Sequence, residues 1–464
     1  MEKTAKNPFE GSSVSRAILT FALPTIISQL ITTVYNLADT FWVGRLGDPN
    51  QLAALSVVFP MQLLMTATGN LFGIGAGTCI SAKLGEKDFD KAKLASVFSF
   101  YFGGLTAILF AILVFCLKKP LMTVLGSTAA IDGFVSDYLN IVMVCGALPT
   151  IFNLTVANML RGEGLSFAAS AGLSLGGLLN IILDPFFVLP GYLGMSVKGA
   201  AVATLISNCV TTLFFVTLLV VRRRKTALCF RPRIFEAAKT MGAVVLFTGL
   251  PSALMMLLSA VSNTVLNKLM IRYGETAEAA VGITKKIDAI PFGAISGLTQ
   301  GVAPLIAYDY GANNRKRLKK TVKLSFAYSS VFAIIVLTII ECLAKPITSL
   351  FINDALTIDY ATNFLRLHCA SLPFLAVTFL LISFFQAVGA KTRAFLLSII
   401  RKGAVDIPLM FLLDYVYPVF GIILCQPVTD VISAITGALL FFGWHKKHPL
   451  EDDTEIHIDY ENMA

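Results

Sequence analysis

The stretch FALPTIISQLITTVYNLADTFWVGRLGD, residues 21–48, decides how this chain folds. It is a long apolar run of helical length, with Pro24 near its start and a carboxylate, Asp39, well inside it. An ionised aspartate costs about 3 kcal/mol at the centre of a bilayer, so such a residue usually faces a cavity or a partner. The run therefore predicts a membrane-spanning helix whose aspartate has a function.

Similar apolar runs recur along the whole chain. Of the 464 residues, 56% are hydrophobic and 14% charged, and the mean hydropathy of +0.76 is too high for a soluble protein of this size. A run of about 20 apolar residues is long enough to cross a bilayer as a helix. The sequence thus predicts an all-α polytopic membrane protein with twelve transmembrane helices, at 16–43, 52–82, 95–117, 134–158, 165–189, 197–221, 241–271, 278–308, 321–344, 359–386, 392–416 and 420–443.

Positive charge alternates between the loops. The loops after spans two, six, eight and ten are rich in Lys and Arg, most clearly at residues 222–225 and 315–320, whereas the intervening loops carry few. Loops rich in Lys and Arg usually lie on the cytoplasmic side. This pattern predicts a multi-pass protein of the cytoplasmic (plasma) membrane with both termini in the cytoplasm. It also accounts for the net charge of +9 without a nucleic-acid partner.

The two halves of the chain repeat each other. Residues 21–48 align without a gap on TGLPSALMMLLSAVSNTVLNKLMIRYGE, residues 248–275, so that Pro24 meets Pro251. Further matches join 73–93 to 299–319, 159–167 to 384–392, and 197–207 to 419–429. A parallel repeat of six helices places a substrate site between two bundles. The predicted domains are an N-terminal six-helix bundle (1–221), a basic cytoplasmic linker (222–240), a C-terminal six-helix bundle (241–443) and a cytoplasmic tail (444–464).

Some polar residues belong to one half only. Asp39 aligns with Leu266, and in span five Asn180 and Asp184 lie one helical turn apart on one face. Matched through the prolines of spans five and eleven, their second-half counterparts are Gly403 and Ile407. A shift of one residue would instead place Asp406 opposite Asp184. Departures from the repeat indicate specialised positions.

The polar residues of three spans lie at one predicted depth. At the outer ends of their spans, Asp39 lies six residues before Arg45, Asp184 six before Pro190 and Thr204 six after Lys198, and Asn180 lies one turn below Asp184. At about 1.5 Å per residue this places them roughly 9 Å inside the membrane boundary. Oxygen ligands of this kind suit Na⁺, and a buried carboxylate can also load and unload a proton. The four residues are predicted to form a cation-coupling site for H⁺ or Na⁺.

Other polar residues allow two interpretations each. Tyr35, Asn36 and Gln300 could line a substrate cavity or join neighbouring helices through hydrogen bonds. Lys286 and Asp288, near the outer end of span eight, could line the cavity of the second bundle or reach the membrane surface. The sequence leaves these alternatives open.

No segment has the spacing of a zinc-protease or nucleotide-binding motif. The glycines of GIGAG, residues 73–77, lie inside an apolar run, where small residues favour close helix packing. Motifs of the forms HExxH and GxxxxGK[ST] are absent from the sequence. We therefore expect a protein that is not an enzyme, is not driven by ATP, and needs no cofactor besides its coupling ion.

Several motifs together resemble one family. The first helix, GIGAGTCISAKLGEKDFDKAK, LNIILDPFF, VKGAAVATLIS and GVAPLIAYDYGANN are similar to the multidrug and toxic compound extrusion (MATE) family, in particular its MepA-like bacterial branch, over essentially the whole chain. The resemblance implies a V-shaped pair of six-helix bundles that exports bulky hydrophobic, often cationic compounds in exchange for Na⁺ or H⁺. It assigns the N-terminal cation site and the bend of the first helix to Asp39, Asn180, Asp184, Thr204 and Pro24.

The sequence also departs from one branch of that family. The NorM-like branch has additional acidic residues in spans seven and ten, and this chain has none at 261–268 or 370–385. The departure argues against a cation site in the second bundle.

Two rival functions remain for the whole chain. A lipid-linked saccharide flippase of the wider superfamily would have extra spans and an Arg-rich central cavity, and a non-transporting sensor or scaffold would have a sizeable soluble domain. The sequence shows neither feature. The secondary active multidrug antiporter that the resemblance implies is therefore our expectation, acting as a monomer among membrane lipids.

Overall fold

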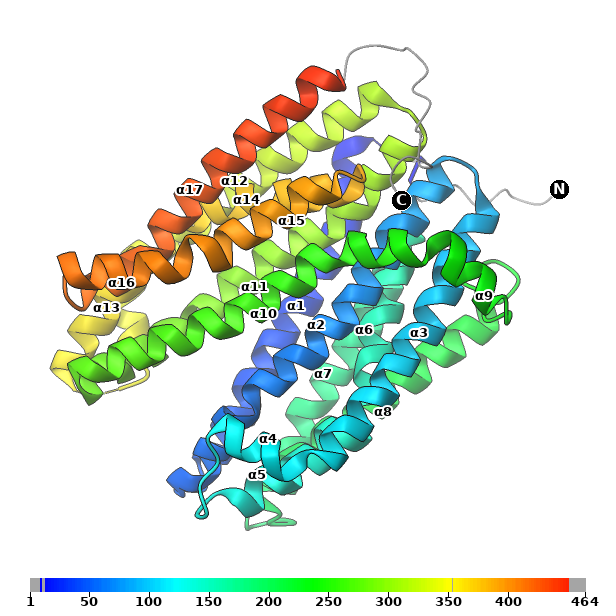
Figure 1. Ribbon diagram of the computed structural model, residues 1–464. Helices are drawn as coiled ribbons and strands as arrows, with labels where there is room; N and C mark the ends of the chain where they lie inside the picture. Colours follow the sequence, from blue (N-terminus) through cyan, green and yellow to red (C-terminus); the bar gives the residue numbers. More distant parts are fainter. Residues whose placement is uncertain (1–8, 11–12, 353, 450–464) are drawn as a thin grey trace. The chain divides into compact units, whose positions relative to one another are not determined.

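The computed structural model describes residues 9–10, 13–352 and 354–449. Every regular element in these residues is helical (Figure 1). The helices are α1 (Val14–Gly44), α2 (Pro49–Gly85), α3 (Phe89–Cys116), α4 (Lys118–Leu125), α5 (Asp132–Tyr138), α6 (Ala147–Gly162), α7 (Ser166–Val188), α8 (Ser196–Arg222), α9 (Ile234–Ala237), α10 (Ala243–Met270), α11 (Glu275–Gly311), α12 (Arg315–Ser349), α13 (Ala355–Cys369), α14 (Leu372–Ala387), α15 (Lys391–Ile399), α16 (Asp406–Val416) and α17 (Phe420–Lys447). Short π-helical turns η1 (Leu139–Cys145), η2 (Ala238–Gly242) and η4 (Ile400–Ala404) and the 3-10 turn η3 (Ile271–Tyr273) continue some of them.

Helices of membrane-spanning length dominate the fold. Within the described residues, nine helices are long and apolar enough to cross a membrane, and two bent helix pairs raise the number to as many as eleven. The pairs, α5–η1 with α6 and α13 with α14, are bent by 49° and 42°. The predicted span at 392–416 is divided by η4 into α15 and α16, each too short to cross alone. The all-helical polytopic fold is confirmed.

Large apolar side chains are exposed along these helices. On α3, for example, Leu109, Ile112 and Phe115 have exposed fractions of 55%, 53% and 65%. Contiguous apolar surface of this kind is unfavourable in water and matches the hydrocarbon of a bilayer. The exposed faces of the long helices are therefore suited to contact lipids.

The internal repeat is visible in the helix caps. At the start of α3 the Asp88 carboxylate accepts a hydrogen bond from the backbone N–H of Lys91 at 3.0 Å. At the start of α12 the Asn314 side chain accepts one from the backbone N–H of Arg317 at 3.1 Å. The residue before each cap has a positive φ, of 63° and 53° respectively. The alignment of 73–93 with 299–319 therefore reflects the same local structure.

Contacts divide the chain into two compact units. One unit is Met1–Ile26 with Leu254–Ala464, and the other is Ile27–Ala253. The first boundary falls two residues after Pro24 and the second two residues after Pro251. The two prolines that the repeat aligns thus mark the points in α1 and α10 where the chain passes from one unit to the other.

The predicted linker at 222–240 contains ordered structure. Glu163, just after α6, accepts hydrogen bonds from the Thr226 hydroxyl at 2.6 Å and from the Ala227 N–H at 2.5 Å. Arg233 forms an ion pair with Asp90 at 2.9 Å. Helical structure begins at α9 and continues through η2 into α10. Residues 450–464 of the predicted tail lie outside the described residues.

Glycines allow the first segments of α1 and α10 to pack closely against neighbouring helices. A Cβ atom on Gly301 of α11 would lie 2.7 Å from the Cα of Ala22 of α1. In the other unit, a Cβ atom on Gly75 of α2 would lie 2.2 Å from the carbonyl oxygen of Val245 of α10. Gly75 and Gly301 are aligned in the repeat. The interpretation of residues 73–77 as a packing motif is confirmed.

We expect Gly301→Ala to destabilise the protein by roughly 1–3 kcal/mol, because the added methyl group separates α1 from α11. The measurement is the melting temperature of the purified protein in detergent. Gly282→Ala is the matched control on the same helix, since a Cβ atom there meets nothing within 4 Å. Equal melting temperatures for the two variants would contradict the prediction.

Candidate cation-coupling site

Side chains from α1, α7 and α8 meet within the unit Ile27–Ala253. The Asn180 amide Nδ2 donates hydrogen bonds to Asp184 Oδ1 and to Thr204 Oγ1, both at 3.3 Å. Asp39 of α1 lies close enough to Asp184 and Asn180 to interact with them electrostatically. The structure thus brings together the four residues that the sequence predicts at one depth.

The group is buried, and several of its oxygen atoms accept no hydrogen bond from the described residues. Asp39, Asn180 and Asp184 are 7%, 2% and 0% exposed, and Thr204 is half-buried. One oxygen of each of the first three side chains is buried and accepts no hydrogen bond from the described residues. Buried oxygens without donors are costly, and two neighbouring carboxylates repel each other. The arrangement is therefore suited to a bound cation or proton.

A glycine on α7 allows α1 to approach. A Cβ atom on Gly177 would lie 2.7 Å from the Cγ2 atom of Ile31 and 3.2 Å from the Cδ1 atom of Tyr35. Tyr35 and Asp39 are four residues apart and lie on one face of α1. Close packing at Gly177 therefore directs the face bearing Asp39 toward α7, where Asp184 lies two turns beyond the glycine.

Two further polar side chains adjoin the group. Tyr138, at the end of α5, is 2% exposed, and its hydroxyl oxygen accepts a hydrogen bond from Gln62 of α2 at 2.7 Å. Tyr138 also lies within electrostatic range of Asp39 and Asp184. Its own hydroxyl proton can therefore be donated to another acceptor. Sequence reasoning missed both residues, because a single Tyr or Gln in an apolar run gives no signal of this proximity.

Tyr35 and Asn36 have different surroundings. Tyr35 is half-buried and lies within electrostatic range of Asp39, whereas Asn36 is exposed and interacts with the Tyr35 side chain. Tyr35 is therefore part of the environment of the carboxylate group. The role of either residue in substrate contact stays a prediction.

The other predicted cavity residues belong to the unit that contains Leu254–Ala464. Asp288 pairs with His368 of α13 at 3.2 Å, and Gln300 donates a hydrogen bond to Ser296 on its own helix at 2.9 Å. Lys286 is exposed. Asp288 is thus engaged in a contact between α11 and α13, and Gln300 in a contact within α11, and their role in substrate contact also stays a prediction.

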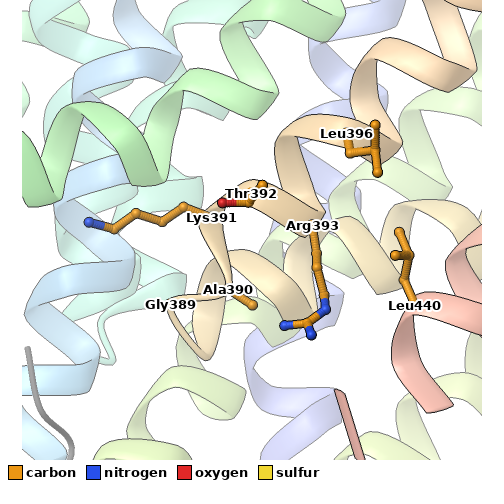
Figure 2. A pocket seen from close by; sticks show the side chains of 7 residues that line it. All are labelled: Gly389, Ala390, Lys391, Thr392, Arg393, Leu396 and Leu440. Carbon is orange, nitrogen blue, oxygen red and sulfur yellow. The ribbon is translucent and has the colours of Figure 1, made fainter. Parts of the chain in front are cut away.

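A pocket of about 520 Å³ lies at the turn between α14 and α15 (Figure 2). Its lining residues are Gly389, Ala390, Lys391, Thr392, Arg393, Leu396 and Leu440. Figure 2 shows the Arg393 side chain beside Leu440, with Lys391 extending in a different direction. The pocket includes none of the predicted site residues.

A family comparison agrees with this arrangement. The family model described as MatE matches residues 24–186 and 251–412, one segment in each half, and each segment begins at one of the two aligned prolines. The chain belongs to the MATE family. It is therefore a multi-pass membrane transporter and not an enzyme, which confirms the family predicted from the sequence.

Curated relatives cover almost the full length. The chain is 30% identical to the multidrug export protein MepA of Staphylococcus aureus, over 94% of this chain and 95% of the relative. It is 28% identical to the protein of the same name from Staphylococcus haemolyticus, over 97% and 98% of the two chains. The MepA-like branch is thus confirmed.

Solved structures share the fold. The outward-facing conformation of a multidrug resistance MATE family transporter of the MOP superfamily matches with a TM-score of 0.89 and 26% identity, over 97% of this chain and 99% of the other. A MOP superfamily transporter from Pyrococcus furiosus, described as having a binding pocket of reverse polarity, matches with a TM-score of 0.88 and 25% identity, over 97% and 100%. The predicted MATE-like fold is confirmed.

Proposed function

We propose that this transporter is a secondary active antiporter that exports bulky hydrophobic, often cationic compounds in exchange for H⁺ or Na⁺. The relatives named as multidrug export proteins support the substrate class. The alternating loop charges support a place in the cytoplasmic membrane with both termini inside the cell. The protein works as a monomer in contact with lipids.

The coupling ion binds at Asp39 and Asp184, assisted by Asn180 and Thr204. This assignment is carried by three buried side-chain oxygens that accept no hydrogen bond from the described residues. Two of them belong to the neighbouring carboxylates of Asp39 and Asp184, and the third to the amide of Asn180. Na⁺ takes oxygen ligands of this type, and a proton shared by the two carboxylates relieves the same repulsion. No group of three or more His, Cys, Asp or Glu side chains in the described residues could hold a metal ion, so the amide and hydroxyl oxygens complete the ligand set.

Ion uptake and drug release are linked through α1. When the ion binds, the group around Asp39 loses negative charge, and a cationic drug attracted to the carboxylates is held less tightly. Pro24, inside α1, lacks a backbone N–H and provides a point where the helix can bend. Binding of the ion and binding of the drug therefore oppose each other, as antiport requires.

Transport by purified protein in proteoliposomes tests this function. We expect an imposed Na⁺ or H⁺ gradient to drive ethidium against its own concentration gradient. To identify the coupling ion, each ion gradient is imposed separately, with the other ion at equal concentration on both sides of the membrane. Vesicles with neither gradient serve as the control. Ethidium movement that only follows its own gradient would contradict coupled export.

A further inference from the structure

A second buried polar cluster lies in the unit that contains Leu254–Ala464. The Lys402 ammonium donates hydrogen bonds to Asp406 Oδ2 at 3.3 Å and to Gln426 Oε1 at 2.6 Å. Asp406 Oδ2 also accepts a hydrogen bond from Ser262 Oγ of α10 at 2.5 Å. Asp406 is 0% exposed and the Lys402 side chain 11% exposed. A carboxylate and an ammonium group are thus enclosed together.

The cluster repeats the spacing of the cation-coupling site. Asn180 donates to residues 4 and 24 positions along the chain, and Lys402 donates to residues at the same two separations. The last residues of the two sets, Thr204 and Gln426, are aligned in the repeat. This is the register in which Asp406 lies opposite Asp184. Lys402 lies in the π-helical turn η4, just before α16 begins at Asp406.

The second cluster differs from the first in its charge. Lys402 takes the place of the neutral Asn180, so that the carboxylate of Asp406 has a cation within the chain itself. No ion pair joins Asp39 or Asp184 to a Lys or Arg among the residues that the structure describes. The first site thus needs a cation from solution, and the second does not.

Neighbouring charged groups do not alter this balance. Arg401 pairs with Asp430 at 2.8 Å and is therefore occupied. Cys425 Sγ lies 3.5 Å from Asp406 Oδ1, and Lys285 of α11 donates to Asn267 at 2.8 Å while lying within electrostatic range of Lys402. These are the titratable and charged groups around Asp406 and Lys402.

We infer that the Lys402 ammonium is a tethered cation, which takes in the second bundle the place that the coupling ion takes in the first. The inference rests on the proposed function of Asp39 and Asp184. An ammonium group on a side chain neutralises Asp406 permanently and cannot exchange with Na⁺ or H⁺ from solution. Coupling is thereby confined to one bundle. Removal of the Lys402 charge creates a second exchangeable site, whose oxygens come from Asp406, Gln426 and Ser262.

Thermal melting in detergent tests this inference in a background of Asp39→Asn, which removes one carboxylate of the first site. In Asp39→Asn/Lys402→Asn we expect the melting temperature to rise by about 3 °C or more beyond the rise in Asp39→Asn alone when NaCl replaces choline chloride, or when the pH falls and Asp406 takes up a proton. Any response of Asp39→Asn alone comes from Asp184, which the two variants share. Addition of Asp406→Asn to the double variant removes the additional response, because the ligand is then neutral.

The inference fails if the double variant and its Asp406→Asn derivative show the same dependence on Na⁺ and on pH. Lys402→Met/Asp406→Leu, in otherwise unchanged protein, supplies an independent test should Lys402→Asn not fold. Replacement of a buried ion pair by apolar residues is often neutral for stability. We expect this variant to keep the wild-type ratio of ion-driven to passive efflux, and a loss of that ratio in folded protein would overturn the inference. The difference in melting between the double variant and its Asp406→Asn derivative does not depend on whether Asp39 binds the coupling ion, so a failure of the proposed function is recognised separately.

Discussion

Asp39→Asn is expected to abolish ion-driven efflux. The substitution keeps the shape of the side chain and removes the charge that, in the function we propose, binds the ion together with Asp184. In metal sites, loss of one residue that hydrogen-bonds to a ligand lowers metal affinity or activity by about 10- to 100-fold. Loss of a charged ligand itself should therefore reduce uphill ethidium transport by at least this factor. The measurement is gradient-driven transport in proteoliposomes. Retention of uphill transport by the variant would disprove the assignment of Asp39.

Stability gives a second measurement for the same variant. Asp39 has a buried oxygen without a hydrogen-bond donor and faces a second carboxylate, so removal of its charge relieves repulsion. We therefore expect Asp39→Asn to melt no lower than the wild type. Asp137→Asn is the matched control, since Asp137 is 48% exposed and lies 4.0 Å from Lys198. It should leave both transport and melting unchanged.

The fold could be predicted from the sequence because the membrane requires long apolar runs. Each predicted span corresponds to a helix or to a broken helix, and the aligned Pro24 and Pro251 mark equivalent places in α1 and α10. The breaks themselves were not predicted, although Pro373 at the start of α14 marks one of them. The π-helical turn η4 contains Arg401 and Lys402, whose charge interrupts the apolar run at that point.

The depth of the candidate site residues in the membrane could be predicted from the sequence, but their neighbours on other helices could not. Asp39, Asp184 and Thr204 could be placed at one depth by counting residues from the ends of their spans, because the rise per residue is constant along an α-helix. Tyr138 could not, because its position against the carboxylates follows from the bend between α5 and α6 and from packing against α2. Depth is encoded locally, whereas the side on which two helices meet depends on the whole bundle.

The ion pair of Arg401 and Asp430 shows how buried charge also supports the second cluster. Asp430 accepts a hydrogen bond from Gln426 Nε2 at 3.0 Å, and Gln426 in turn accepts from Lys402. The Arg401 guanidinium lies 4.8 Å from the centre of the Phe379 ring. These contacts join the structural ion pair to the tethered cation, so that damage to the pair should also loosen Lys402.

We expect Asp430→Ala to destabilise the protein by roughly 3–5 kcal/mol, because it leaves the Arg401 charge buried without a carboxylate. Arg401 is 2% exposed and Asp430 0%, so water cannot replace the lost partner without a rearrangement. In detergent this corresponds to a fall in melting temperature of about 4 °C, since the entropy of unfolding is about 1 kcal/mol/K for a chain of this length.

Glu341→Ala is the matched control for this variant, since its partner Arg366 lies 3.6 Å away and both side chains are more than 40% exposed. An exposed pair of this kind contributes about 1 kcal/mol or less. Arg401→Met/Asp430→Leu should recover much of the loss, because no charge then remains buried at this position. If Asp430→Ala instead melted like Glu341→Ala, the Arg401 charge would have to reach water, and the enclosed environment that keeps Lys402 beside Asp406 would not exist.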